Sequence, residues 1–263
     1  MNIYKPRDIL ARIETLELEL TKLNAARSLS AVPRRLEIRH AGDCKLLMDH
    51  ADTASPYYNR IKGFGTQHIA ELDKLLAEYG KASPSFELTP EGMAESVARS
   101  LGERGYWPVQ QLVYMYMETL DDAGGHSEFE IERVTEETAE AFVGWIRDSH
   151  GDMVITQEMM ARSKPFFHRP DFANYMLRID GAPAAMGSMF IYGRSGYLAN
   201  DYTFETYRGR GCQTSLIRRR LSDARALGLD FVATDVEFGT ASHGNMLKAG
   251  FKTAYLNTFW MKG

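Results

Sequence analysis

Residues 208–214 read Arg208-Gly209-Arg210-Gly211-Cys212-Gln213-Thr214, a turn with two glycines and two arginines directly before an apolar-periodic segment. Ile217 and Leu221 continue that segment at helical spacing, so a helix is expected to begin at the turn. The first turn of a helix leaves backbone N–H groups without partners, and the helix dipole adds positive potential there. The stretch therefore predicts a phosphate site, because glycines permit positive φ and a close approach of the backbone to an anion.

Two other glycine-rich phosphate sites fit this stretch poorly. A P-loop ends in Gly-Lys followed by Ser or Thr, whereas this turn ends Gly211-Cys212-Gln213. A dinucleotide fingerprint needs three spaced glycines in a parallel strand–helix–strand unit, and here an expected three-strand meander precedes the turn. A glycine turn followed by a solvated arginine face is the alternative interpretation of the turn taken alone.

The segments around the turn predict a mixed α/β domain, because strands and helices of ordinary length alternate along the chain. Asp180-Gly181 between two strand-like runs is a strong hairpin signal. The expected elements are a strand from Phe129, a helix capped by Thr135, a helix over 156–163, meander strands over 174–179, 184–192 and 197–204, a helix after the turn, a strand over 229–236, a helix over 240–249 and an extended segment over 251–261.

The turn and a later segment together resemble the GNAT superfamily of N-acetyltransferases. Residues 207–214 are similar to the acetyl-CoA loop of that family, (Gln/Arg)-x-x-Gly-x-(Gly/Ala), with Arg208 and Gly211 at the first two fixed positions and Gln213 departing from the last. Residues 242–251, Ser-His-Gly-Asn-Met-Leu-Lys-Ala-Gly-Phe, resemble the family's late helix, which ends in Gly-Phe and faces the CoA arm. The resemblance implies the GNAT acyl-CoA N-acyltransferase fold from about residue 128 onward, with acetyl-CoA as co-substrate and no metal.

The resemblance also implies roles for individual residues. The strand before the turn would contact the pantetheine arm, and the amides of the turn would hold the pyrophosphate. Many members use a tyrosine of the late helix to protonate the leaving thiolate, but the matching residue here is Met246, which cannot donate a proton. Ser242, His243, Tyr255 or water could replace it, and Ser242 is taken as the catalytic candidate. The expected cofactor-binding residues are Thr203, Phe204, Arg208, Gly209, Arg210, Gly211, Cys212, Gln213, Thr214 and Asn245.

Amide formation from a thioester also needs a base, because an amine with a pKa of about 10.4 is mostly protonated at pH 7. Four carboxylates on or next to neighbouring predicted strands are candidates, namely Asp201, Glu205, Asp235 and Glu237. Asp201 is favoured because a period of two places it on the same strand face as Thr203. A solvated or structural charge is the alternative role for each of the four.

The residues before the Gly-rich stretch 121–127 predict a first half of a different kind. Leucine and isoleucine at spacings of three and four predict a helix over 6–28. Residues 57–65 resemble a segment of two-part GNAT members whose first half has no CoA loop. We expect an N-terminal helix (1–30), a degenerate GNAT-like half (31–126) and an acetyl-CoA-binding catalytic domain (127–263). Further expected elements are strands over 36–40, 59–64, 85–88 and 109–117, a helix over 67–79, and a helix from Thr89-Pro90 to Gly102.

Composition limits the classes of function. Hydrophobic residues make up 44% and charged residues 25% of the 263 residues, which is typical of a globular protein. A net charge of −4 without a basic tract argues against a nucleic-acid partner. The two cysteines, Cys44 and Cys212, lie too far apart in sequence for a Cys-based zinc motif. No apolar run approaches the roughly 20 residues that span a membrane, so no membrane partner and a cytoplasmic location are expected.

These observations predict an acetyl-CoA-dependent N-acetyltransferase that moves the acetyl group to a primary amine of a small molecule by direct attack on the thioester. A protein or peptide amine is the alternative acceptor. A non-catalytic acyl-CoA-binding regulatory module is the alternative of a different class. A monomer and a homodimer are both compatible with the sequence.

Overall fold

The computed structural model describes residues 5–118, 129–151 and 153–263, and it divides the chain into two compact units. Unit 1 comprises residues 1–31 and 114–254, and unit 2 comprises residues 32–113 and 255–263. This division differs from the expected one at both ends of the chain: the N-terminal helix belongs to unit 1, and residues 255–263 belong to unit 2. The expected linker at 121–127 lies outside the described residues.

Unit 1 contains a mixed sheet in the order β6-β7-β8-β9-β10-β5. The meander expected from the sequence is confirmed, because β7 pairs antiparallel with β8 and β8 with β9, whereas β9 and β10 are parallel. The bounds are Glu130–Arg133 for β6, Phe172–Ile179 for β7, Ala182–Tyr192 for β8, Ser195–Thr203 for β9, Phe231–Glu237 for β10 and Tyr106–Met117 for β5, whose last residues lie in this unit.

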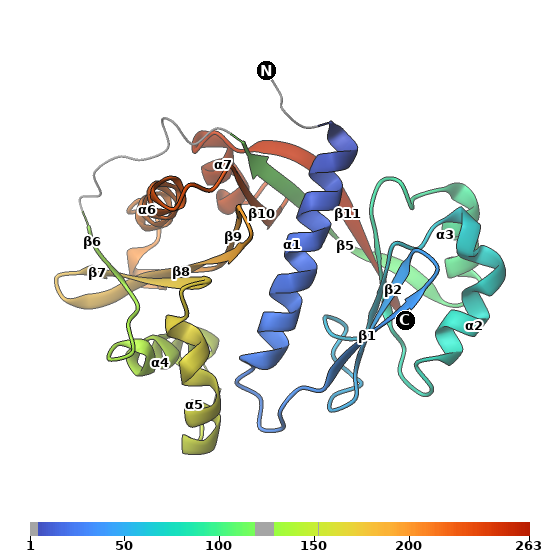
Figure 1. Cartoon of the computed structure of the whole chain (residues 1–263), viewed down its shortest axis with the longest axis horizontal. Helices are drawn as coiled ribbons and strands as arrows, with labels where there is room; N and C mark the ends of the chain where they lie inside the picture. Colours follow the sequence, from blue (N-terminus) through green and yellow to red (C-terminus); the bar gives the residue numbers. More distant parts are fainter. Residues whose placement is uncertain (1–4, 119–128, 152) are drawn as a thin grey trace. The chain divides into compact units, whose positions relative to one another are not determined.

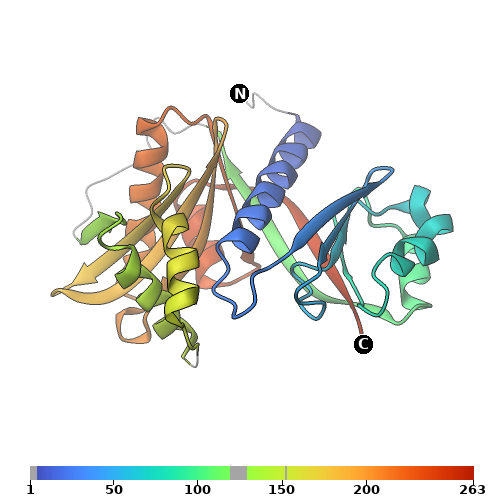
Figure 2. The same ribbon diagram turned by 60° about the horizontal axis from the view of Figure 1, so that its bottom comes forward.

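Helices cover both faces of this sheet. The helices α4 (Ala139–His150) and α5 (Gln157–Ser163) lie on one face of β7 and β8, and α6 (Cys212–Ala226) lies on the other (Figures 1 and 2). The helix α7 (Ala241–Lys248) follows β10. Short 3-10 turns occur at Lys164–His168 and Glu205–Tyr207. The expected cap of α4 at Thr135 is wrong by one turn: Thr138 precedes the helix, and its hydroxyl accepts the Thr135 N–H at 2.9 Å, so Thr135 opens the turn before it.

A β-bulge interrupts the pairing of β8 with β9. Met186 pairs with Tyr202 and Ser188 with Ala199, so two residues of β9, Asn200 and Asp201, stand opposite Gly187 alone. Asn200 has a positive φ of 55°, a conformation that asparagine tolerates better than most residues. The bulge directs the Asn200 and Asp201 side chains differently from a regular strand, and both enter the site described below.

The N-terminal helix α1 (Pro6–Ala26) packs on β8 and β9 of unit 1. Its expected apolar stripe is buried, including Ile13 and Leu16. Arg12 donates hydrogen bonds to Asp230 and, at 2.7 Å, to the Ser195 hydroxyl. Just past the C-terminal end of α1, Ser163 of α5 donates to the Ser28 carbonyl at 3.0 Å. Contacts at both ends therefore fix this helix within unit 1.

Unit 2 contains the sheet order β1-β2-β3-β4-β11-β5. Residues 255–263 belong here because β11 pairs antiparallel with β4, with Phe259 opposite Glu87. The core is formed by apolar residues of these strands and of the helices, among them Phe86 and Val97. The elements are β1 (Leu36–Ala41), β2 (Cys44–Asp49), β3 (Arg60–Lys62), β4 (Ser85–Leu88), β11 (Lys252–Lys262), a 3-10 helix (Thr66–Glu71), α2 (Leu72–Ala77) and α3 (Glu95–Gly102).

Two details of unit 2 differ from the sequence-based expectation. The strand β2 was not predicted, because five of its six positions are buried and it shows no alternation of apolar and polar residues. The helix expected from Thr89-Pro90 begins only at Glu95, because Gly92 donates its N–H to the Thr89 carbonyl at 2.9 Å and closes a turn there. Among the described residues, no helix is long and apolar enough to cross a membrane.

Candidate active site

A cavity of about 550 Å³ in unit 1 lies at the N-terminal end of α6. It collects residues from β9, the turn before α6, the first turn of α6 and the start of α7. The described residues that line it are Asp201, Tyr202, Thr203, Tyr207, Arg208, Gly209, Gly211, Cys212, Gln213, Thr214, Ala241, Ser242 and Asn245. Ten of the twelve residues expected from the sequence at the site are therefore brought together here.

The backbone at the start of α6 has the geometry that an anion site needs. Gly209 and Gly211 have φ of 77° and 82°, left-handed values that favour glycine. Gly211 is the N-cap residue, and its carbonyl accepts the Ser215 N–H at 3.0 Å. The N–H groups of Cys212, Gln213 and Thr214 belong to the first helical turn, where helix geometry offers them no carbonyl within the helix. These donors line the cavity at the positive end of the helix dipole.

Gln213 connects the two helices that border this cavity. Its Nε2 donates to the Ser242 hydroxyl at 2.9 Å, and its Oε1 accepts from Nδ2 of Asn245 at 2.8 Å. Gln213 stands where the family pattern has a small residue, and its longer side chain bridges α6 to α7. Ser242 accepts this hydrogen bond and still carries its own hydroxyl hydrogen to donate.

Two of the expected cofactor-binding residues, Phe204 and Arg210, are not among the described residues that line this cavity. Phe204 packs edge-on against Trp145 and Tyr202, at ring-centroid distances of 6.1 and 5.2 Å. The guanidinium of Arg210 lies over the Tyr207 ring at 5.6 Å. Arg208, in contrast, lines the cavity, and its Nε donates to the Thr203 carbonyl at 3.3 Å.

The cysteine of the turn is a buried thiol. Cys212 is 2% exposed and its Sγ donates to the Tyr207 carbonyl at 3.6 Å. Burial raises the pKa of this thiol, so it remains protonated at neutral pH. Its side chain serves to pack the first turn of α6.

Asp201, the favoured base, is engaged in an ion pair. Arg220 of α6 donates from Nη1 to Oδ2 of Asp201 at 3.0 Å and from Nη2 to Oδ1. The Arg220 side chain is fully buried, and that of Asp201 is 16% exposed. A guanidinium that binds both oxygens of a carboxylate fixes its position, so this geometry favours a structural role for Asp201, and its assignment as the base stays a prediction.

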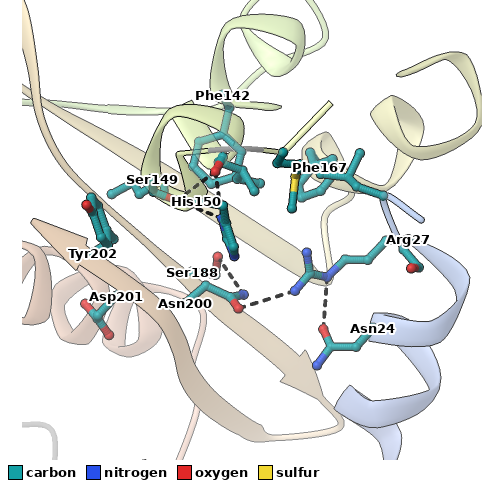
Figure 3. Close-up of a pocket in the computed structure, with 15 residues that line it drawn as sticks. Asn24, Arg27, Phe142, Ser149, His150, Phe167, Ser188, Asn200, Asp201 and Tyr202 are labelled. Carbon is teal, nitrogen blue, oxygen red and sulfur yellow. Dashed lines mark hydrogen bonds between the residues drawn. The ribbon is translucent and has the colours of Figure 1, made fainter. Parts of the chain in front are cut away.

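A second cavity of about 430 Å³ lies on the other side of the bulge in unit 1, between α1, α4, β8 and β9 (Figure 3). It shares Asp201 and Tyr202 with the first cavity, so the two cavities meet at the bulge. Figure 3 shows His150 and Arg27 directed into this space from α4 and from the end of α1. Its described lining residues are Asn24, Arg27, Ser28, Leu29, Phe142, Ile146, Ser149, His150, Met153, Phe167, Met186, Ser188, Asn200, Asp201 and Tyr202.

His150 has a defined tautomer in this cavity. Its Nδ1 lies 2.8 Å from the carbonyl oxygen of Ile146, and a carbonyl can only accept, so Nδ1 carries the hydrogen. Ser149 donates to the same carbonyl at 2.7 Å. In the neutral ring Nε2 then has a lone pair that can accept a proton. Sequence reasoning did not select His150, because nothing in its surroundings in the chain distinguishes it from a helix-capping histidine.

The strands β9 and β10, beside the first cavity, pair along only part of their length. The register of β9 with β10 covers Ser195–Tyr197 and Phe231–Ala233. Next to it the Thr234 hydroxyl donates to the Leu198 carbonyl at 3.0 Å. Residues 199–203 of β9 lie beyond this parallel register of the described strands, and residues 201–203 of them line the first cavity, where a ligand with amide groups could pair with the backbone.

The other carboxylate candidates lie elsewhere. Glu205, Asp235 and Glu237 are not among the described lining residues of either cavity. Asp235 accepts a hydrogen bond from the buried Tyr197 hydroxyl at 2.6 Å, and Glu205 pairs with Arg208 at 3.2 Å. Among the residues that the structure describes, no cluster of His, Cys, Asp and Glu could hold a metal ion.

Several solved structures with the same fold are described as acetyltransferases or proteins of the GNAT type. A GCN5-related N-acetyltransferase from Kribbella flavida superposes with a TM-score of 0.65 at 18% identity, over 96% of this chain and 95% of that chain. A tandem GNAT protein from the clavulanic acid biosynthesis pathway superposes with a TM-score of 0.58 at 14% identity, over 94% of each chain. A GCN5-related N-acetyltransferase from Sphaerobacter thermophilus gives 0.58 at 13% identity, over 98% and 93%. The prediction of a GNAT fold is confirmed.

Sequence comparison alone does not reach this result. No protein-family model matches the chain, and no curated protein matches it. The likeness to solved structures therefore establishes the fold, while the site rests on the residues described above.

Proposed function

Because the chain has the fold of the GNAT acetyltransferases, we propose that it transfers an acetyl group from acetyl-CoA to a primary amine of a small molecule. The observation that carries the proposal is the pair of cavities that meet at Asp201 and Tyr202. The first lies at a helix N-terminus suited to an anion, and the second has the volume of a small-molecule site. A transferase needs both spaces side by side, because the acceptor nitrogen must reach the thioester carbon.

The first cavity would hold CoA. The first-turn N–H groups of residues 212–214 would bind the pyrophosphate, and Arg208, which is paired with Glu205, would border it at the cavity wall. The backbone of residues 199–203 would pair with the amides of the pantetheine arm, in the manner of an added strand. A pyrophosphate at one end and a peptide-like arm along a strand edge distinguish CoA from a simple nucleotide.

The second cavity would hold the acceptor amine, and His150 would take its proton. A primary amine with a pKa of about 10.4 is about 3.4 units above neutral pH, so making it a nucleophile costs about 4.6 kcal/mol. The Nε2 lone pair of His150 can accept that proton, directly or through a water molecule. The nitrogen then forms its bond to the acetyl carbon while the carbon–sulfur bond breaks, and CoA leaves as the thiolate.

The leaving thiolate needs little help. A free thiol has a pKa near 8.5, and Ser242, whose hydroxyl hydrogen remains available after its contact with Gln213, is the proposed proton donor. Met246 is 1% exposed and occupies a packing position on α7. Proton donation by Ser242 therefore adds only a modest factor to the rate. Removal of the amine proton by the base adds a larger one.

The size of the second cavity favours a small acceptor over a protein. Its volume of about 430 Å³ lies within the range of small-molecule sites. A non-catalytic acyl-CoA-binding module is the second candidate function, favoured by the ion pair that engages Asp201. Turnover distinguishes the two candidate functions: an acetyltransferase releases CoA when an amine is present, and a binding module does not.

The decisive experiment measures thiol release from acetyl-CoA across a panel of amines, together with acetyl-CoA binding by calorimetry. We expect binding and amine-dependent release, and tight binding without release for any amine would favour the non-catalytic module. Gly211→Asp places a carboxylate at the N-cap beside the expected pyrophosphate and should weaken acetyl-CoA binding by at least tenfold. Unchanged affinity of this variant would place the cofactor elsewhere.

The base is tested by comparing His150→Gln with Asp201→Asn. For the His150 variant we expect the rise of kcat with pH to flatten, since glutamine cannot take up a proton. The Asp201 variant should retain the shape of the profile. The opposite pattern would assign the base to Asp201.

A further inference from the structure

Tyr202 of β9 stands between the two cavities of unit 1. Among the described residues, Tyr202 and Asp201 are the two that line both cavities. A side chain that borders two neighbouring spaces separates them at that point, so its volume helps to set the width of the opening between them. The Tyr202 side chain is half-buried, which leaves part of its surface facing these spaces.

The other border of the opening is fixed by the ion pair of Asp201. Arg220 binds both carboxylate oxygens, and its own side chain is fully buried. The pair is also tightly packed, because a Cβ added at Gly187 would lie 3.0 Å from Oδ1 of Asp201 and 3.0 Å from Nη1 of Arg220. Asp201 therefore cannot withdraw from the opening without loss of the pair.

Aromatic contacts hold the Tyr202 ring in place. It packs edge-on against Phe204, with the ring centroids 5.2 Å apart and an angle of 87° between the ring planes. Phe204 in turn packs edge-on against Trp145 of α4, at 6.1 Å and 83°. The guanidinium of Arg178 lies over the Trp145 ring at 5.0 Å. Phe204 is not among the described residues that line either cavity, but it supports a residue that lines both.

The pairing of β8 with β9 adds a further neighbour to the ring. Met186 stands directly opposite Tyr202 in the antiparallel ladder, next to the bulge, so the two side chains lie on the same face of the sheet. Met186 is 4% exposed and lines the second cavity. Figure 3 shows Tyr202 beside Asp201 at one side of that cavity. A side chain packed against neighbours on its own strand and on the adjacent strand resists displacement.

The opening is the place where the chain behind the acyl carbonyl would lie. Under the proposed function CoA enters from the first cavity and the amine from the second, so the thioester carbon would lie between them. An acetyl group places a single methyl there, and each further methylene adds volume beside the Tyr202 ring. One methylene more or less in an apolar pocket changes kcat/KM by about 10- to 200-fold.

We propose that the Tyr202 ring limits the transferred group to acetyl, which makes Tyr202 the residue that determines acyl-chain length and Phe204 its positioning residue. The proposal rests on the proposed function, because it names the class of acyl donor that the same site takes. The reaction itself is unchanged: the amine nitrogen bonds to the acyl carbon, the carbon–sulfur bond breaks, and CoA leaves as the thiolate. Only the length of the chain behind the carbonyl is selected.

The test measures kcat/KM for acetyl-, propionyl-, butyryl- and hexanoyl-CoA with the full-length protein and one constant amine. For the wild type we expect a loss of at least about tenfold from acetyl- to propionyl-CoA and a further loss to butyryl-CoA. Tyr202→Ala removes the ring and should bring the butyryl-CoA value to within about threefold of the acetyl-CoA value. Tyr202→Phe keeps the ring and should leave the ratio as in the wild type. Equal use of acetyl- and butyryl-CoA by the wild type, or equal ratios in wild type and Tyr202→Ala, overturns the proposal.

Phe204→Ala tests the positioning role. It removes the support of the Tyr202 ring, so the preference for acetyl- over butyryl-CoA should fall by about 3- to 10-fold with little change in kcat for acetyl-CoA, and Phe204→Tyr should restore the preference. Tyr192→Ala is the matched control, since Tyr192 is 49% exposed at the end of β8 and lies outside both described linings. It should leave the ratio unchanged. Melting temperatures show whether each variant folds, and Tyr202→Leu decides the matter if Tyr202→Ala unfolds.

Binding measured without an amine separates this proposal from the proposed function. By calorimetry the wild type should bind acetyl-CoA at least about tenfold more tightly than butyryl-CoA, and the difference should shrink below about threefold in Tyr202→Ala. Chain-length selectivity of this kind without acyl transfer to any amine would refute the proposed function alone. Transfer of acetyl and butyryl groups with equal efficiency would refute the inference alone, and failure to bind every acyl-CoA would refute both.

Discussion

Arg220 and Asp201 form an ion pair between α6 and the bulge of β9, in which the guanidinium is fully buried and the carboxylate borders both cavities. Arg220 also donates to the carbonyls of Ser188 and Leu216, at 2.9 and 3.1 Å. One side chain thus joins β8, β9 and α6 at the point where the first and second cavities meet. The ion pair holds the bulge of β9 against α6.

Arg220→Met should lower the free energy of unfolding by about 3 kcal/mol, because it leaves the Asp201 carboxylate and two carbonyls without their buried donor. Urea unfolding at pH 7 measures the effect. Arg218→Met, on an exposed position of the same helix, is the control and should change stability by less than about 0.5 kcal/mol. Equal effects of the two substitutions would show that the Arg220–Asp201 pair contributes nothing to the free energy of unfolding.

Gly187→Ala should destabilise the protein by about 1–3 kcal/mol and reduce activity. An added Cβ would lie 3.0 Å from Nη1 of Arg220 and 3.0 Å from Oδ1 of Asp201, and neither atom can yield without breaking the ion pair. At Gly144 in α4, an added Cβ meets no atom within 4 Å, and alanine there should stabilise the helix by about 0.5–1 kcal/mol. Thermal and urea unfolding of both variants check the opposite signs, and a neutral Gly187→Ala would contradict the tight packing.

Gln213→Ala should weaken acetyl-CoA binding by about 3- to 10-fold, because it removes both hydrogen bonds that hold α7 against the start of α6. Calorimetric titration with acetyl-CoA gives the affinity. Asn245→Ala should have a smaller effect in the same direction. The double variant should lose less than the product of the two single losses, since the residues share one bond, and strict multiplicativity would show that they act independently.

Asp230→Asn should lower the melting temperature at pH 7 by about 1–3 °C, and this difference should vanish in acid. Burial raises the pKa of Asp230, but hydrogen bonds and charge from Arg12 and Arg194 outweigh burial and hold the pKa below its ordinary value. A carboxyl with a depressed folded pKa stabilises the fold above its unfolded pKa of about 3.9, and the contribution is lost as the pH falls through the folded value. Melting curves of wild type and variant from pH 7 to pH 3 should therefore converge below about pH 4. A constant difference across this range would rule out the ion pair as its source.

The lining of the first cavity could be predicted in large part from the sequence because it comes from two short stretches of the chain, 201–214 and 241–245. Gly209 and Gly211 mark the turn, and ten of the twelve residues predicted for the site line this one cavity, while their role in binding a cofactor stays a prediction. Phe204 and Arg210 are the exceptions, since they lie in the same stretch but direct their side chains toward aromatic neighbours. The two glycines predict the backbone conformation of the turn, but the sequence does not predict where the side chains of Phe204 and Arg210 point.

The second cavity could not be predicted, because its residues come together only through packing of distant elements. Arg27 lies at the end of a helix whose pattern indicates only an apolar stripe, and His150 ends another helix. Asn200 enters the site through a bulge, which shifts the alternation of side chains and leaves no mark in the pattern of polar and apolar residues. Asp201 lies on a strand and Arg220 on a helix. Neither the strand period of two nor the helix period of 3.6 residues predicts that they pair.

The attachment of α1 to unit 1 brings residues from two distant parts of the gene to neighbouring cavities. The groups that would bind the cofactor are encoded between residues 201 and 245, whereas Asn24 and Arg27 are encoded near the beginning of the chain. Exchange of the first 30 or so codons between homologues would therefore change the lining of the second cavity and leave the residues of the first cavity as they are. Divergence or recombination at this junction would alter the two cavities independently.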